Sequence, residues 1–220
     1  MKLANKIAEI LAEKLNYSDE QRKVMAYGLI AVIQMLELLI ISLIFGLIFD
    51  CLYECMIVFL GVGLMRRTTG GAHCSTYAAC MMTSSLSICL IALLCRSIIP
   101  SFLPKWAYAV FGIIPAFTCF ALLAYKRVPQ AATNKPITNP DKIKRLRKQC
   151  FNTMLAYLAL AIVLLLIDRG EGRNITSLCA LICVLYWQSF TLTPLCTNLA
   201  QAMDSCSQLI MIKHHLTERR

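Results

Sequence analysis

Long apolar runs constrain this chain more than any other feature of its sequence. The first extends from about Met25 to Phe49, and a helix of that length crosses the roughly 30 Å hydrocarbon core of a bilayer. Hydrophobic residues make up 58% of the chain and charged residues 15%, against roughly 45–50% and about 25% in soluble domains. A soluble fold is therefore excluded. The 12 cysteines among 220 residues are too few for a disulfide-rich secreted scaffold, and we expect reduced thiols.

The apolar runs predict an all-α polytopic membrane protein, with about six transmembrane helices in a single domain, residues 1–220. The predicted spans are Met25–Phe49, Cys55–Met65, Tyr77–Leu94, Trp106–Tyr125, Phe151–Ile167 and Ile175–Leu195. The second run is too short to cross the bilayer by itself, so neighbouring residues complete it or it forms a thin or re-entrant element.

Residues 1–15 carry a different pattern, with apolar side chains three or four positions apart and charges between them. This helical period predicts an amphipathic helix that lies on the membrane surface. The apolar positions are Leu3, Ile7, Ile10, Leu11 and Leu15.

Basic residues are distributed unevenly about the predicted spans. All but four of the 22 Lys and Arg residues fall in the N-terminal segment before the first span, the turn at Arg66, the loop Lys126–Lys148 and the C-terminal tail. Because basic residues near span ends stay in the cytoplasm, both termini and this loop should face it. The net charge of +10 is mostly this asymmetry, so we expect no nucleic-acid partner.

The long basic loop ends in a helix start. Asn139 resembles an N-cap and Pro140 a first helical residue, so a helix should begin there and continue into the fifth span. Its first turns can bind anionic lipid headgroups or dock an acidic peptide. The basic side chains in question are Lys142, Lys144, Arg145, Arg147 and Lys148.

Candidate chemistry concentrates between Arg66 and Cys80, where His73 lies among potential nucleophiles. A cysteine attacks as its thiolate, and an imidazole that accepts the thiol proton favours that form. His73 and Cys80 are therefore a candidate catalytic dyad. Seven residues on one continuous helix lie about 10 Å apart, so the two can meet only if the chain folds back at Gly70 and Gly71.

The fold-back places Cys80 near the start of the third span, where the positive end of the helix dipole stabilises a thiolate. Ser75 or Thr76 can cap that helix, and its first amides can receive an oxyanion. Cys74 is the rival nucleophile, but it is adjacent to His73 and points elsewhere in regular structure.

Other polar or thiol groups have packing explanations. Glu37, halfway along the first span, can orient His73, support a polar channel or make an interhelical hydrogen bond. Two cysteine pairs are four residues apart and share a helix face, but no histidine or polar shell lies nearby in the sequence, so we expect packing and neither a metal nor a cofactor. These pairs are Cys51 with Cys55 and Cys179 with Cys183.

The chain resembles the accessory gene regulator B (AgrB) family of bacterial membrane peptidases. The resemblance rests on matching residues in matching order, and it extends over nearly the whole chain. They are Arg66, Gly70, Gly71, His73 and Cys80, then Asn134, Lys135 and Pro136 in the basic loop.

The resemblance implies a membrane-embedded cysteine endopeptidase at the cytoplasmic face of a bacterial cell membrane. It would cut the C-terminal tail from an AgrD-type propeptide of quorum sensing, form an acyl-enzyme thioester on Cys80, and promote closure to a thiolactone or lactone. His73 would activate Cys80, and the family's pairing implies a homodimer among membrane lipids. The residues expected to bind substrate are Arg66, Arg67, Gly70, Gly71 and Lys135.

Two other functions fit parts of the sequence. A noncatalytic transporter or scaffold would explain Glu37 but gives no reason for glycines beside a histidine and a nucleophile. A cysteine acyltransferase would share the thioester, so only its substrate would distinguish it from the peptidase.

Overall fold

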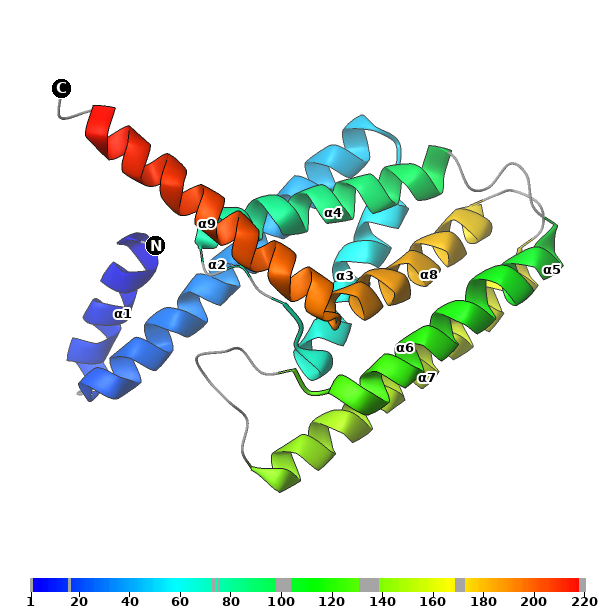
Figure 1. The fold of residues 1–220 in the computed structure, drawn as a ribbon, viewed down its shortest axis with the longest axis horizontal. Helices are drawn as coiled ribbons and strands as arrows, with labels where there is room; N and C mark the ends of the chain where they lie inside the picture. The colour runs from blue at the N-terminus through cyan, green and yellow to red at the C-terminus, as the bar shows by residue number, and fades with distance from the viewer. Residues whose placement is uncertain are drawn as a thin grey trace. The chain divides into compact units, whose positions relative to one another are not determined.

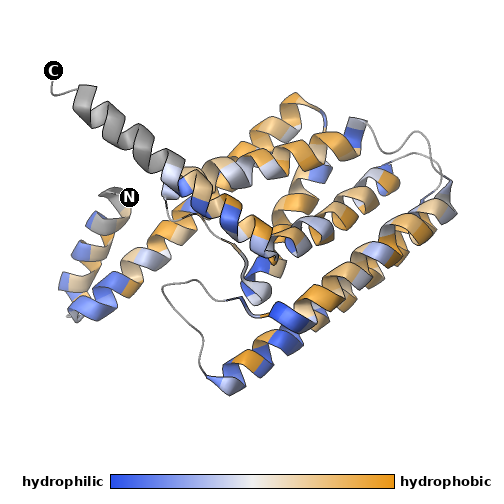
Figure 2. Cartoon of the chain, in the orientation of Figure 1, coloured by the Kyte–Doolittle hydropathy of each residue, from blue (hydrophilic) through white to orange (hydrophobic). Residues whose placement is uncertain are grey.

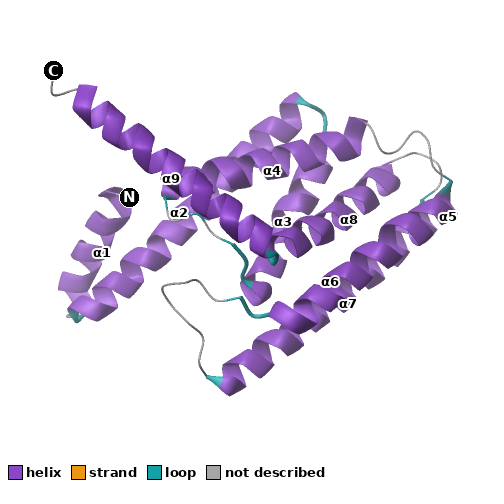
Figure 3. Cartoon of the chain, in the orientation of Figure 1, coloured by secondary structure: helices purple, strands orange, loops and turns teal. Residues whose placement is uncertain are grey.

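The computed structural model describes residues 2–15, 17–72, 74, 76–97, 104–130, 139–168 and 173–217. Within these ranges every regular element is helical, and the one β contact is an isolated bridge between Gly70 and Gln130 (Figures 1 and 3). The chain divides into two compact units, residues 1–41 and 42–220. The predicted all-α fold is confirmed. The helices are α1 (Lys2–Leu15), α2 (Asp19–Ile48), α3 (Leu52–Thr69), α4 (Tyr77–Ser97), α5 (Lys105–Ala107), the π-helix η1 (Tyr108–Ile113), α6 (Ile114–Arg127), α7 (Pro140–Ile167), α8 (Arg173–Thr191) and α9 (Pro194–Thr217).

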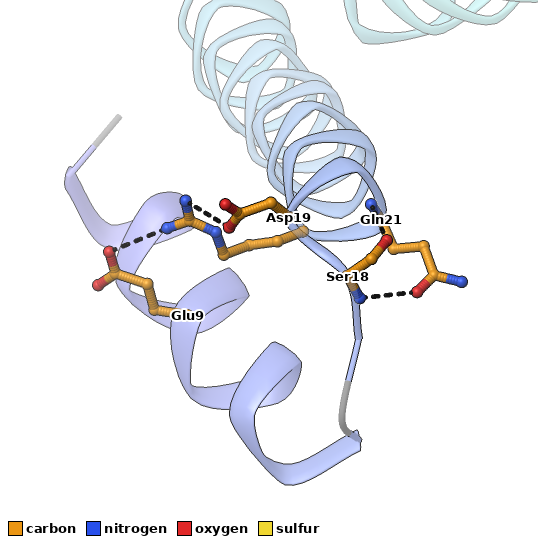
Figure 4. Close-up of polar contacts among 5 residues, drawn as sticks. Glu9, Ser18, Asp19 and Gln21 are labelled. Atoms are coloured by element: carbon orange, nitrogen blue, oxygen red, sulfur yellow. Dashed lines mark hydrogen bonds and ion pairs between the residues drawn. The ribbon is translucent and has the colours of Figure 1, made fainter.

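A polar connection joins α1 to α2 in the first unit (Figure 4). Ser18 and Gln21 form a capping box, in which the Ser18 N–H donates to Gln21 Oε1 at 2.9 Å and the Gln21 N–H donates to Ser18 Oγ at 3.4 Å. Arg22 lies 3.4 Å from Glu9 and 3.1 Å from Asp19, measured between nitrogen and oxygen. These contacts fix where α2 begins.

The predicted N-terminal helix is present as α1. Its buried face is made of small residues, Ala4, Ala8 and Ala12, which recur every four positions. Ile10 and Leu15 of the predicted apolar stripe are about half exposed, at 47% and 53%. Large apolar side chains therefore stay on the surface of α1, as a helix in the membrane interface requires.

Five described helices are long and apolar enough to cross a membrane (Figure 2). They correspond to five of the six predicted runs, and this apolar content is that of a membrane protein. Of these five, α8 is the most deeply packed, with 72% of its apolar window buried, and α3, α4, α6 and α7 all contact it. The five candidate spans are Asp19–Ile48, Tyr77–Ser97, Tyr108–Arg127, Pro140–Ile167 and Arg173–Thr191.

The short second run is a helix as well, but α3 is not among the five candidates. Its 18 residues rise about 27 Å, and they include Glu54, Arg66 and Arg67. Glu54 is buried at 2% exposure, and the Tyr157 hydroxyl of α7 donates to the Gly61 carbonyl at 2.9 Å. Thus α3 packs against the other helices of the second unit, and its charged residues lie near its two ends.

Two helices, α7 and α9, begin with a polar residue followed by a proline. Asn139 caps α7 as predicted, since its Oδ1 accepts from the Asp141 N–H at 2.9 Å and Pro140 occupies the first turn. The last predicted span was expected to reach Leu195, but α8 ends at Thr191 and α9 begins at Pro194. Thr193 Oγ1 there accepts from the Cys196 N–H at 3.4 Å, so a Thr-Pro pair starts this helix as Asn-Pro starts α7.

Candidate active site

The chain reverses direction immediately after α3, at the glycine pair. Gly70 has φ of +70° and Gly71 has φ of +131°, a region that favours glycine. A Cβ added at Gly70 would lie 2.1 Å from the Gln130 carbonyl oxygen, and one at Gly71 would lie 3.0 Å from Thr191 Oγ1. The described residues therefore form a turn at the predicted glycine pair, and the space there allows only glycine at Gly70. That this turn brings His73 to Cys80 stays a prediction.

Three segments hold this turn by hydrogen bonds. The Gln130 N–H donates to the Thr69 carbonyl at 2.9 Å, and the Ala72 N–H donates to the Thr191 carbonyl at 3.0 Å. Buried Gln188 donates from Nε2 to Thr69 Oγ1 at 2.6 Å and to the Gly70 carbonyl at 3.1 Å. We call residues 69–72, Gln130 and residues 188–191 the glycine junction.

Cys80 lies in the first turn of α4, beyond the glycine junction. Its N–H donates to the Thr76 carbonyl at 3.1 Å, which closes the first turn of the helix. The amides of Tyr77, Ala78 and Ala79 therefore precede the helical ladder, as the first amides of every helix do. The half-buried Cys80 side chain occupies the end of the helix where the dipole favours negative charge.

Arg66, in the last turn of α3, brings positive charge to the same place. Its Nη2 donates to the Ala72 carbonyl at 2.6 Å, and burial lowers the pKa of Arg66, which the thiols of Cys80, Cys196 and Cys74 counteract electrostatically. A guanidinium stays protonated at neutral pH. Cys74, Cys80 and Cys196, which we call the junction thiols, therefore interact electrostatically with one half-buried cation.

Cys74, the rival nucleophile of the sequence analysis, lies between the glycine junction and α4 and is half-buried. Burial raises the pKa of the Cys74 thiol; Asp204 and Cys80 add to this, while a hydrogen bond with Thr83 and the charge of Arg66 act in the opposite direction. A raised pKa leaves less thiolate at neutral pH. This environment therefore disfavours attack by Cys74 at neutral pH.

Several predicted site residues remain predictions. His73, Ser75 and Lys135 lie outside the described residues. Arg67 is exposed at the end of α3, and Glu37 is exposed on α2 in the first unit.

The described contacts of the glycine pair are with the chain itself. Gly70 meets Gln130 and Gly71 meets Thr191, so their expected contact with substrate also stays a prediction.

Gln130 escaped the sequence analysis, and so did three residues at the site that lie much further along the chain: Gln188, Thr191 and Asp204. Asp204 Oδ1 of α9 accepts from the Thr76 N–H at 3.2 Å and from the Thr76 hydroxyl at 3.4 Å. No sequence motif marks these partners, because they lie more than a hundred residues from the turn. The Thr193–Pro194 pair was the available signal that a further helix follows α8.

Four other thiols lie in pairs elsewhere in the second unit. Cys51 Sγ is 3.8 Å from Cys55 Sγ, and Cys95 Sγ is 3.7 Å from Cys183 Sγ. Throughout the described ranges, no group of three or more His, Cys, Asp or Glu side chains could hold a metal ion.

Comparison with known proteins places the chain in a family. The sequence model of accessory gene regulator B matches residues 4–192. AgrB-like protein 2 of Clostridium perfringens strain 13 is 28% identical over 209 residues, covering 93% of this chain and 96% of that protein. An AgrB-like protein of strain SM101 is 28% identical over 213 residues, covering 95% and 98%. No solved structure matches. The chain therefore belongs to the accessory gene regulator B family, a membership that supports a role in processing a quorum-sensing propeptide.

Proposed function

We propose that the protein is a membrane-embedded cysteine endopeptidase that cuts the C-terminal tail from an AgrD-type propeptide and promotes cyclisation of the remaining fragment. The observation that carries this proposal is the position of Cys80. It lies in the first turn of α4, just beyond a glycine turn, and within electrostatic reach of the half-buried Arg66. Nucleophilic thiols need such an electropositive, partly accessible setting.

In the proposed reaction, His73 takes the proton of the Cys80 thiol, and the sulfur attacks the scissile carbonyl. The first amides of α4 receive the oxyanion. The carbon–nitrogen bond then breaks, the amine takes the proton from His73, and the acidic tail leaves. A thioester between the substrate and Cys80 remains.

The second step closes the ring. A cysteine or serine within the bound fragment attacks the thioester, forms a thiolactone or lactone, and returns the proton to regenerate Cys80. With a substrate thiol, one thioester replaces another, so this step is nearly isoenergetic, whereas converting an amide into a thioester is uphill. Product should therefore accumulate only when the released tail is removed or separates into another phase.

In this proposal, positively charged side chains form the surface that binds the acidic tail of the propeptide. Arg66 and Arg67 end α3, the predicted contributor Lys135 belongs to the basic loop, and the hydrophilic start of α7 follows (Figure 2). Arg147 Nε donates to the Val128 carbonyl at 2.7 Å, which ties α7 to the end of α6. The exposed basic residues of this start are Lys142, Lys144, Arg145, Arg147 and Lys148.

The location belongs to the proposal as well. Both termini and the site would face the cytoplasm, and the propeptide's amphipathic leader would approach along the membrane interface. A site at the lipid boundary restricts water, which would otherwise hydrolyse the thioester. The protein would act as a homodimer among membrane lipids.

Reconstituted protein in lipid vesicles, incubated with a synthetic propeptide that has an amphipathic start, an internal cysteine and an acidic end, tests the proposal. Cys80→Ala should abolish cleavage, His73→Ala should reduce it by at least about a hundredfold, and Cys74→Ala should leave it within about threefold. Mass spectrometry of released tail measures all three.

Cleavage by Cys80→Ala at the wild-type rate would contradict the proposal, and so would full turnover by His73→Ala at neutral pH. Acyl transfer to an acceptor other than the propeptide would favour the acyltransferase instead. Proton- or solute-coupled flux without cleavage would favour the transporter.

A further inference from the structure

The helix α9 contacts the start of α4 (Figure 1) and places an acidic residue, Asp204, beside it. Cys196, Ala200 and Asp204 follow one another at intervals of four residues, so they share one face of α9. Ala200 is buried at 9% exposure, Cys196 interacts electrostatically with Arg66, and Asp204 reaches Thr76. This face is therefore packed against the site, although the family match ends at residue 192.

The contact of Asp204 is made to the residue that closes the first turn of α4. Its Oδ1 accepts from both the N–H and the hydroxyl of Thr76, at 3.2 and 3.4 Å. The Thr76 carbonyl in turn accepts from the Cys80 N–H at 3.1 Å. A short hydrogen-bonded relay thus connects the carboxylate to the backbone that carries the proposed nucleophile.

A second contact fixes the same stretch of helix. Thr83 Oγ1 donates to the Ala79 carbonyl at 2.7 Å and lies 3.6 Å from Met203 Sδ. Met203 and Asp204, which are adjacent on α9, therefore contact Thr83 and Thr76, at the two ends of the first two turns of α4. A carboxylate at a helix amino end is also favoured by the dipole.

We propose that Asp204 is a positioning residue for Cys80: by accepting from Thr76 it holds the first turn of α4, and hence the attacking sulfur, in its reactive orientation. The inference rests on the proposed function of Cys80. Attack on a carbonyl is sensitive to displacements of about 1 Å, which can change a rate by about a hundredfold. Loosening the first turn should accordingly slow the chemical step and leave substrate binding little changed.

The test compares Asp204→Ala with Asp204→Asn in the full-length protein in vesicles. Alanine removes the acceptor, whereas asparagine keeps one in the same position. We expect kcat for the synthetic propeptide to fall about ten- to a hundredfold in Asp204→Ala, with KM within about twofold, and to recover to within about threefold of wild type in Asp204→Asn. Ser205→Ala is the matched control, because Ser205 Oγ donates only along its own helix in the contacts described, to the Gln201 carbonyl at 3.0 Å.

Amide hydrogen exchange of the peptide that contains Thr76–Thr83 provides a readout without substrate. Exchange at the Cys80 amide should accelerate about tenfold in Asp204→Ala and stay near the wild-type rate in Asp204→Asn. Wild-type kcat in Asp204→Ala, equal impairment of both variants, or unchanged exchange would overturn the inference. Absence of cleavage by the wild type would instead refute the proposed function, and the exchange measurement would still decide whether Asp204 holds the turn.

Discussion

The junction thiols differ from the thiols at the far end of α4, although both groups lie in the second unit. Cys74, Cys80 and Cys196 interact electrostatically with the half-buried guanidinium of Arg66, and Cys74 also interacts with the carboxylate of Asp204. Cys51, Cys55 and Cys95 are fully buried at 0% exposure, and the first two pack with Ala92, Phe45 and Met56.

We call Cys51, Cys55, Cys89 and Cys95 the core thiols. A buried thiol among apolar side chains behaves as a small hydrophobe, whereas a thiol beside a cation at a helix amino end can react. The surroundings of a cysteine, and not the number of cysteines in the chain, therefore mark the candidate nucleophile.

Disrupting the glycine junction should change the surroundings of the junction thiols more than any other substitution proposed here, while it leaves the core thiols unaffected. Gly70→Ala would place a Cβ 2.1 Å from the Gln130 carbonyl oxygen at a φ of +70°, at a strain of roughly 1–3 kcal/mol. Propeptide cleavage should fall by more than about a hundredfold. Gly63→Ala is the control, since nothing lies within 4 Å of its added Cβ; equal activity of the two variants would show that the turn does not position the site.

Removing the shared cation should affect the junction thiols alone. Arg66→Gln should slow iodoacetamide alkylation of Cys80 at pH 7.5 by about tenfold, which corresponds to about 1.4 kcal/mol, and leave the core thiol Cys89 unchanged. Peptide mass spectrometry measures both rates. Arg96→Gln provides the control, because Arg96 pairs with exposed Asp50 at 2.6 Å. An unchanged Cys80 rate would mean that Arg66 does not support the thiolate.

The buried amide of Gln188 should matter for stability more than for chemistry. Gln188→Leu removes the donor to Thr69 Oγ1 and to the Gly70 carbonyl, which should cost about 1–3 kcal/mol of unfolding free energy. Ser189→Ala should cost less, because Ser189 Oγ bonds within its own helix, to the Leu185 carbonyl at 2.8 Å. Thermal unfolding in detergent compares them, and equal melting temperatures would contradict the role of Gln188 in the junction.

The smallest expected effect concerns Cys74. Because burial raises its pKa, the protonated form persists to higher pH, and alkylation should increase only above the pH at which an ordinary thiol ionises. At pH 7.5 we expect a rate several-fold below that of a free cysteine. A pH series of alkylation in Cys80→Ala measures it, and a rate equal to free cysteine would contradict the described environment.

Local signals predicted much of the fold. Apolar runs located five spans, helical periodicity located α1, and the Asn139–Pro140 pair located the start of α7. Each depends on neighbouring residues, so one sequence is enough to reveal it. The need for a fold-back at Gly70 also followed from the sequence, because a helix cannot bring residues seven apart together.

Contacts between distant segments were not predictable from the sequence. Gln130, which follows α6, and Gln188 and Thr191 of α8 hold the glycine turn, and Asp204 contacts Thr76 across 128 positions. Their residue types are ordinary, and only tertiary packing brings them to the turn. The end of α8 was also misplaced, because Thr193 and Pro194 interrupt an apolar run that hydropathy alone continues to Leu195.

Trapping the acyl-enzyme tests the central proposal most directly. Wild-type protein in vesicles would be mixed with the synthetic propeptide, quenched in acid, digested and analysed by mass spectrometry for a thioester adduct. We expect the propeptide fragment, without its tail, on Cys80. An adduct on Cys74 or Cys196 instead, or tail release with all three thiols unmodified throughout the time course, would contradict the account.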